Sequence, residues 1–223
     1  MKHQNTKSTA IIPYRFTKDW FTNNLTRWES IVVPYLKSLK KPITAIEIGV
    51  FEGRSAIWTL ENILEHPKSQ MWLVDNWKRE VSPKVPCWHN FLKNLEAYSR
   101  NHPEQPEDKI MVCKGHIPDM LRSPDLTSQK FDFVYIDVHG YSKDFLEQAV
   151  MVWPMIAPGG MMVIDDYTSN REHDGGCMKQ GVDAFLDLYS KELSVKHMSW
   201  QVMLVKRAKK LPVPGCASEY YSP

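Results

Sequence analysis

The sequence predicts an α/β fold in which a mostly parallel sheet is covered by helices on both faces. Short apolar runs of strand length alternate along the chain with segments of helical periodicity, the pattern of parallel strands joined by crossover helices. The first run, residues 44–48, leads into a glycine turn and then a helix, an arrangement typical of nucleotide-type ligand sites. Both observations place ligand chemistry at the carboxyl ends of the strands.

Residues 1–40 are predicted to form a helical cap ahead of the core fold. Apolar residues there recur at roughly helical spacing, and Pro34 is expected to kink or break the helix. The stripe consists of Trp20, Phe21, Leu25, Trp28, Ile31 and Val32. Since the stripe has no strand of its own to cover and tryptophans should not face water, we expect it to close over the ligand site or to form a homodimer contact.

Residues 41–206 are predicted to form the core. Strands are expected at 44–48, 71–75, 109–113, 131–137, 161–165, 194–198 and 201–205, and helices at 55–64, 90–98, 119–121, 142–153 and 181–190. The last two strands lie too close together for a crossover helix, so they should pair antiparallel. Residues 207–223, which contain three prolines, are expected to be a surface tail or a partner-docking arm.

Composition narrows the class of protein. With 223 residues, of which 43% are hydrophobic, the chain can bury one substantial core. A net charge of +2 gives no reason to expect nucleic acid as a partner. The four cysteines show no C-x-x-C spacing, and the sequence shows neither a secretory signal nor an unbroken membrane-spanning run. We therefore expect a cytoplasmic protein with free thiols and no membrane contact.

The glycine turn differs from a dinucleotide site. Gly49 and Gly53 allow the backbone to turn tightly, but Phe51 and Glu52 occupy the positions between them. A carboxylate at Glu52 would repel a phosphate, whereas a phosphate-free nucleoside cofactor that carries an ammonium group meets no such repulsion. S-adenosylmethionine is such a ligand. Asp75, roughly twenty residues beyond the turn, would accept hydrogen bonds from ribose hydroxyls, which suits both S-adenosylmethionine and NAD.

Four of the five candidate parallel strands end at or beside an acidic residue. These residues are Glu47, Asp75, Asp137, Asp165 and Asp166. A single aspartate at a strand end is as often a helix cap or a turn residue. Several acidic residues gathered at one edge of the sheet are much harder to explain as caps and turns.

Five segments, in this order, resemble class I S-adenosylmethionine-dependent methyltransferases. They are EIGVFEGRS (47–55), LVDNW (73–77), FVYIDVHGY (133–141), APGGMMVIDDY (157–167) and GVDAF (181–185). They are most similar to the macrocin O-methyltransferase-like group, whose members methylate sugar hydroxyls and related small molecules. The resemblance covers about residues 40–206 and implies a Rossmann-like, seven-stranded sheet of order 3-2-1-4-5-7-6, in which only the seventh strand is antiparallel.

The resemblance also implies a cofactor site. Glu47, Gly49 and Gly53 would form its methionine end, Asp75 and Trp77 would hold and flank the ribose, and Gly115 and His116 would lie near the adenine. Ser55 and Asp137 complete the expected cofactor-binding set. For Trp77, an ordinary role in the core or at the rim remains open.

Asp137, Asp165 and Asp166 match the family's divalent metal ligands. Three carboxylates form a hard, all-oxygen site that suits Mg²⁺, and a bound cation would lower the pKa of a sugar hydroxyl. His139 is the candidate general base beside Asp137, although the segment is one residue shorter than the family's, and His173 is the alternative base. Asp165 and Asp166 could also be structural caps.

These observations predict a divalent-metal-dependent O-methyltransferase that acts on a sugar or another small hydroxylated molecule. The acceptor pocket should be lined by the N-terminal helices and the 168–180 loop. A metal-independent or N-directed methyltransferase and a non-catalytic S-adenosylmethionine-binding module remain as alternatives. An NAD oxidoreductase is a more distant one.

Overall fold

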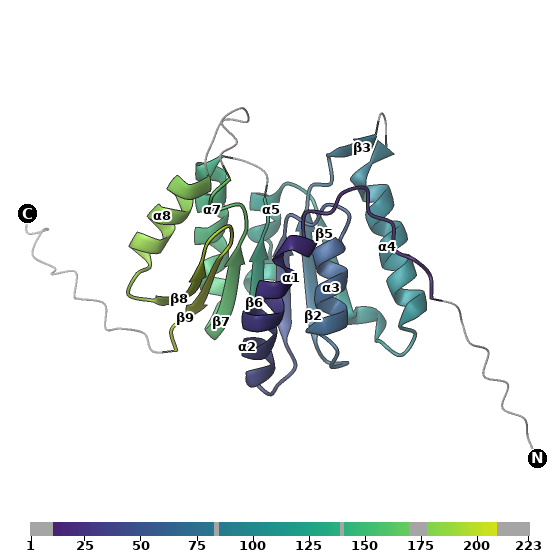
Figure 1. The fold of residues 1–223 in the computed structure, drawn as a ribbon, viewed down its shortest axis with the longest axis horizontal. Helices are drawn as coiled ribbons and strands as arrows, with labels where there is room; N and C mark the ends of the chain where they lie inside the picture. Colours follow the sequence, from purple (N-terminus) through teal and green to yellow (C-terminus); the bar gives the residue numbers. More distant parts are fainter. Residues whose placement is uncertain (1–10, 83–84, 139–140, 170–177, 209–223) are drawn as a thin grey trace, which may run out of the picture.

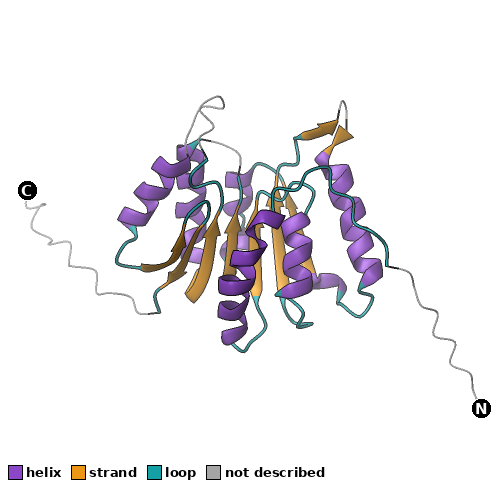
Figure 2. Cartoon of the chain, viewed as in Figure 1, coloured by secondary structure: helices purple, strands orange, loops and turns teal. Residues whose placement is uncertain are grey.

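A seven-stranded sheet runs through the centre of the molecule, with helices packed on both faces (Figures 1 and 2). The computed structural model describes residues 11–82, 85–138, 141–169 and 178–208. The strands are β1 (Thr44–Ile48), β2 (Gln70–Asp75), β5 (Ile110–Lys114), β6 (Phe131–Ile136), β7 (Ile156–Ile164), β8 (Leu193–Met198) and β9 (Val202–Lys206). Their order is β5-β2-β1-β6-β7-β9-β8, which confirms the predicted 3-2-1-4-5-7-6.

The directions of the strands also confirm the prediction. β1 pairs parallel with β2 and β6, β2 with β5, and β6 with β7, whereas β9 runs antiparallel to both β7 and β8. The central strand β6 is buried at every position, because both of its faces are covered by helices. The carboxyl ends of β1, β2, β5, β6 and β7 therefore meet along one edge of the sheet.

Helices form two layers. One face carries α3 (Arg54–Asn62) and α4 (Cys87–Asn101), and the other carries α5 (Ile117–Leu121), α6 (Pro124–Thr127), α7 (Ser142–Val152) and α8 (Met178–Leu188). Two single turns, η3 (Glu107–Lys109) and η4 (Trp153–Met155), lead into β5 and β7. Each layer buries its own apolar cluster against the sheet. No helix in the described part of the chain is long and apolar enough to cross a membrane.

Three local features differ from the prediction. A small antiparallel hairpin, β3 (Glu80–Ser82) and β4 (Val85–Pro86), precedes α4, which begins three residues earlier than expected, after the extended residue Pro86. β7 begins five residues before the expected strand at 161–165, and its register against β6 shifts between Phe131 and Phe133. The length of β7 depends on β6, a partner that is remote in sequence, so local patterns do not predict it.

The N-terminal helix is continuous through Pro34. It consists of η1 (Thr22–Asn24), α1 (Leu25–Arg27), the π-helical segment η2 (Trp28–Val32) and α2 (Val33–Ser38). Proline lacks a backbone N–H and crowds the preceding turn of an α-helix. The wider π turn, in which Val33 donates to the carbonyl of Trp28, stands directly before Pro34 in the first turn of α2. The expected break is therefore absorbed as a π turn.

The apolar stripe of this helix packs against the sheet. Trp28, Val32 and Leu36 are 0–1% exposed. The ring of Trp28 meets Phe133 and Tyr135 of β6 edge-on, with centroids 5.5 and 5.0 Å away, and its Nε1 donates to Gln201 Oε1 at 2.9 Å. The expectation that the stripe covers no strand is thus wrong: it forms a layer of the core. Trp20, which is 46% exposed, is the tryptophan of the stripe that reaches the strand-end edge.

Candidate functional site

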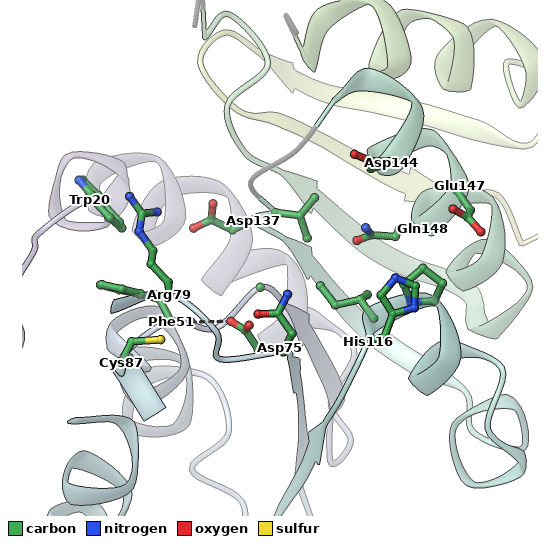
Figure 3. Close-up of a pocket in the computed structure, with 15 residues that line it drawn as sticks. Trp20, Phe51, Asp75, Arg79, Cys87, His116, Asp137, Asp144, Glu147 and Gln148 are labelled. Atoms are coloured by element: carbon green, nitrogen blue, oxygen red, sulfur yellow. Dashed lines mark hydrogen bonds between the residues drawn. The ribbon is translucent and has the colours of Figure 1, made fainter. Parts of the chain in front are cut away.

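Two cavities open at the carboxyl edge of the sheet. The first, of about 410 Å³, extends from Trp20, Phe51 and Arg79 to His116 and α7, with Gly49 and Asp75 between them (Figure 3). The second, of about 430 Å³, is lined by the N-terminal helix and by the ends of β6 and β7. Asp137 and Trp20 line both cavities, so the two meet at these residues. Each is large enough for a small-molecule ligand.

The glycine turn is held close to the end of β6. Gly49 has a φ of +87°, and a Cβ built on it would lie 2.0 Å from the carbonyl oxygen of Asp137. Gly53, with a φ of +81°, ends the turn and begins α3. Only glycine fits the first position, which explains why the chain approaches the first cavity with bare backbone there.

Asp75 organises this turn. Its Oδ2 accepts the backbone N–H groups of Val50 at 2.7 Å and Phe51 at 2.9 Å, and its Oδ1 accepts that of Trp77 at 2.8 Å. A carboxylate has about four acceptor sites, so one site on Oδ1 remains for a ligand. Asp75 lines the first cavity, as predicted for a ribose-binding residue, but most of its capacity fixes the backbone around the ligand.

Trp77 lies behind the cavity wall and lines neither cavity. It is 2% exposed, stacks on Phe91 with centroids 4.6 Å apart, and donates from Nε1 to the carbonyl of Phe51 at 2.8 Å. The expected place beside the ribose is therefore not the one observed. Trp77 supports the turn instead, because its hydrogen bond holds Phe51 in place.

Glu47 and Ser55 meet below the turn. Ser55 Oγ donates to Glu47 Oε1 at 2.6 Å, while Glu47 Oε2 is buried with no partner among the described residues. Burial, together with the nearby charge of Asp75, raises the pKa of Glu47 to about 8, although the Ser55 hydrogen bond lowers it. A buried acid with one unused acceptor is suited to a cationic donor close by.

Glu52 does not face the ligand position as expected. Its carboxylate is 1% exposed and accepts from the backbone N–H of Thr17 at 2.6 Å, from Thr17 Oγ1 at 3.0 Å and from Asn90 Nδ2 at 2.6 Å. These bonds tie the N-terminal segment to α4. The same segment places Trp20 at the cavities, so Glu52 supports the wall of the site without facing a ligand. Its charge therefore gives no argument against a phosphate-bearing ligand.

The far end of the first cavity lies beyond β5. His116 lines it together with Ile117 and Pro118, and its Nδ1 lies 3.2 Å from Asp119 Oδ2. Gly115 donates its backbone N–H to the carbonyl of Asp75, and a Cβ there would press on the side chain of Met120. Asp144, Glu147 and Gln148 of α7 form the opposite wall (Figure 3). The predicted adenine-side residues are thus grouped at one end.

The second cavity contains the predicted metal ligands. Asp137, Asp165 and Asp166 all line it. The hydroxyl of Tyr135 lies 2.6 Å from Asp165 Oδ2 and 3.3 Å from Asp137 Oδ2, and Asp165 Oδ1 accepts the backbone N–H of Asp166 at 2.8 Å. Burial, and then the charges of Asp165, Asp166 and Glu47, raise the pKa of Asp137 well above its usual range. Burial likewise raises the pKa of Asp165.

The three carboxylates are of the right chemical type for a hard cation, but their positions do not form a complete coordination site. No lysine or arginine in the described ranges forms an ion pair with Asp137 or Asp165, so a divalent cation would relieve their mutual repulsion. Within those ranges, however, no three or more His, Cys, Asp or Glu side chains are close enough to hold a metal ion. Both candidate bases, His139 and His173, lie outside the described residues.

Backbone strain gathers at this edge. Four residues other than glycine have a positive φ in the described chain, and three of them are Phe51 (54°), Trp77 (47°) and Asp166 (59°). Such conformations persist only where the surroundings impose them, and they are common at ligand sites. The sequence does not reveal the strain at Phe51 and Trp77, because neither residue type is one that turns select for, whereas an aspartate such as Asp166 is common in turns.

Comparisons with known proteins agree with this geometry. A family model described as a methyltransferase domain matches residues 46–167, more than half of the chain. No curated protein sequence matches significantly. Among solved structures, an O-methyltransferase from Bacillus cereus in complex with SAH superposes with a TM-score of 0.61 at 17% identity, over 85% of this chain and 83% of that one.

Two further structures share the fold. CalS11, a TDP-rhamnose 3′-O-methyltransferase of calicheamicin biosynthesis, has a TM-score of 0.60 at 14% identity, over 82% of this chain and 80% of its own. MycE, a methyltransferase of the mycinamycin pathway in complex with Mg, SAH and mycinamycin VI, has a TM-score of 0.58 at 14% identity, over 89% of this chain and 53% of its own.

Proposed function

The chain belongs to the methyltransferase domain family, and from this premise we propose that it is an S-adenosylmethionine-dependent O-methyltransferase whose acceptor is a sugar or another small hydroxylated molecule. The observation that carries the proposal is the meeting of two cavities at Asp137. A group transfer needs the methyl donor and the acceptor in adjoining spaces with a short path between them. Cofactor in the first cavity and acceptor in the second would satisfy that need.

The first cavity fits a nucleoside that carries an amino acid. Gly49 brings bare backbone to its wall, Asp75 keeps one acceptor site for a ribose hydroxyl, and Glu47 keeps one buried acceptor near the turn. His116 lies at the adenine end in this assignment. The O-methyltransferase of Bacillus cereus, which shares the fold, was solved with SAH.

In the second cavity, Asp137, Asp165 and Asp166 would hold a divalent cation. When bound, a cation there lowers the pKa of an acceptor hydroxyl and neutralises the carboxylates. We assign His139, two residues beyond Asp137, as the base that takes the hydroxyl proton. MycE, solved with Mg, and CalS11, which is a TDP-rhamnose 3′-O-methyltransferase, support the metal and the sugar as the first choices to test.

A metal-independent O-methyltransferase is the second candidate, and the position of Tyr135 favours it. The Tyr135 hydroxyl lies between Asp165 and Asp137, where it stabilises the pair without a cation. In that case a proton would relieve the repulsion between the carboxylates, and catalysis would depend on positioning and the exclusion of water.

Three measurements test the proposal on the full chain. Calorimetry should show micromolar binding of S-adenosylmethionine and SAH, and no comparable binding of NAD. Transfer of a labelled methyl group should be screened over nucleotide sugars, glycosides and catechols. With an acceptor in hand, excess chelator should abolish turnover and Mg²⁺ should restore it, while SAH binding stays unchanged. Full turnover in chelator would select the second candidate, and tight NAD binding without SAH binding would reject both.

A further inference from the structure

Arg79 stands at the end of the first cavity nearest the glycine turn (Figure 3). Its guanidinium carbon lies 4.8 Å from the ring centroid of Trp20 and 5.6 Å from that of Phe51, and the two rings are 5.0 Å apart. Guanidinium groups stack on aromatic faces in this way, which limits their rotation. The backbone carbonyl of Arg79 accepts the N–H of Cys87 at 2.8 Å, so its main chain is fixed as well.

Stacking leaves the edge of a guanidinium available. The five N–H donors of arginine lie in the plane of the group, so a guanidinium held over an aromatic ring can still donate from its edge. Within the described part of the chain, no hydrogen bond or ion pair involves the Arg79 side chain. Arg79 therefore presents oriented donors to the cavity, in the fork geometry that binds a carboxylate through two parallel bonds.

Acidic oxygens lie across the same part of the cavity. Asp137 lines it directly, and Glu47, which lines neither cavity, is buried below Gly49 with its Oε2 unpartnered. An ammonium group placed here would donate to these oxygens and favour their charged forms. A ligand whose carboxylate and ammonium group are attached to the same carbon would therefore pair with Arg79 and with these acids at once.

We propose that Arg79 binds the α-carboxylate of the amino acid end of the cofactor, with the ammonium group directed to the side of Asp137 and Glu47. The inference rests on the proposed function, because it takes S-adenosylmethionine as the ligand. Arg79 then determines selectivity for a cofactor that keeps its amino acid tail. Trp20, which lines both cavities, holds Arg79 in place from the acceptor side.

Calorimetry with matched ligands tests this assignment. SAH carries the carboxylate, and its decarboxylated analogue, the adenosyl thioether of 3-aminopropane, differs only in lacking it. Arg79→Gln should weaken SAH binding by about 10- to 100-fold, the effect of losing a charge-assisted pair, and should change the affinity for the analogue by less than about 3-fold. Lys78→Gln is the matched control, because it removes a neighbouring positive charge that lines neither cavity, and it should change neither affinity.

The other outcomes are also informative. Arg79→Lys should recover part of the SAH affinity, because it restores the charge without the fork. It also serves as the second variant if Arg79→Gln unfolds. An equal loss for SAH and the analogue would overturn the proposal and leave Arg79 with a purely structural role. Unchanged SAH affinity in Arg79→Gln would overturn it as well. A wild-type protein that binds neither ligand would instead reject the proposed function.

Discussion

The two cavities share Asp137 and Trp20, yet the carboxylates that line them differ in their hydrogen-bond partners. In the first cavity, Asp75 accepts three backbone N–H groups from the turn and from the end of its own strand. In the second, the half-buried Asp137 and the buried Asp165 share one hydroxyl, that of Tyr135. Asp75 thus has three backbone donors of its own, whereas Asp137 and Asp165 compete for a single hydroxyl donor.

This difference distinguishes a carboxylate that supports the local backbone from carboxylates that are suited to a reaction. A carboxylate whose oxygens accept backbone N–H groups holds the surrounding turn in one conformation and so builds a rigid ligand cradle. Buried carboxylates that repel each other need a proton or a cation, and such groups are characteristic of reaction sites. In the proposed function, we therefore expect the first cavity to bind the cofactor by shape and preorganised backbone, and the second to be the place where the acceptor proton is transferred.

Asp165→Asn should have the largest effect. We expect turnover to fall by about 10²- to 10⁴-fold, because the amide removes a charge that would hold a cation or relay a proton. Stability should be unchanged or higher, because the substitution removes one of the repelling buried charges. Turnover under saturating cofactor and a thermal melt measure the two effects separately.

Asp132→Asn is the matched control for Asp165→Asn. Asp132 is also a buried acid on β6, but it lies near the amino end of the strand, away from both cavities. There it pairs with Lys41 at 2.7 Å and accepts the backbone N–H of Thr44 at 3.2 Å. Its substitution should lower stability and leave turnover nearly intact. Full turnover in Asp165→Asn would remove the second cavity from the reaction.

The glycine turn gives the next largest effect. Gly49→Ala should destabilise the fold by about 3 kcal/mol or more, because it combines backbone strain with a clash against Asp137. Gly159→Ala should cost only about 1–2 kcal/mol, because its φ of +79° is similar but nothing lies within 4 Å of the added Cβ. Urea denaturation compares the two. Equal losses would mean that strain alone governs both sites.

The fold was largely predictable from local patterns. Alternating apolar runs predict the strands of a parallel sheet, and the short connection before residue 202 predicts the antiparallel end. The role of the N-terminal helix was not predictable, because Trp28 meets partners on β6 more than a hundred residues away. Its stripe shows that one face must be buried but does not identify the surface that covers it.

The sequence predicts the acidic residues of the site but not the side chains that cover it. Glycines and strand-end carboxylates are placed by topology, and Gly49, Asp75 and Asp137 line one cavity as predicted. Arg79 is not predictable as a ligand-facing residue, because its position depends on the chain just before the β3–β4 hairpin. Trp20 belongs to the stripe that is expected to close over the ligand site, but the stripe does not show which of its residues faces the cavities, since this depends on the N-terminal segment tied to Glu52.

Asp75→Ala should have a moderate effect on the cradle. We expect SAH binding to weaken by about 1–3 kcal/mol, the cost of losing hydrogen bonds to a charged group. The loss should appear with adenosine as well as with SAH, because the carboxylate acts on the turn and the ribose rather than on the amino acid end. Calorimetry with both ligands checks this. Unchanged affinity for both would move the ribose away from Asp75.

The smallest expected effect is a pH dependence of stability from Glu47. Its pKa is raised from 4.5 to about 8, so the folded state holds a proton that the unfolded state releases above pH 4.5. The stabilisation is therefore complete below pH 4.5 and is lost as the pH rises through 8.

Glu47→Gln removes this contribution, because glutamine stays neutral while its Oε1 can still accept from Ser55. Between pH 5 and pH 8.5 the melting temperature should fall less in this variant than in the wild type. Some slope should remain, since the pKa values of Asp137 and Asp165 are raised in the same direction. Glu96→Gln, at an exposed position on α4, should follow the wild-type curve. Parallel curves for Glu47→Gln and the wild type would assign the whole pH dependence to the second cavity, leaving Glu47 as a scaffold residue like Asp75.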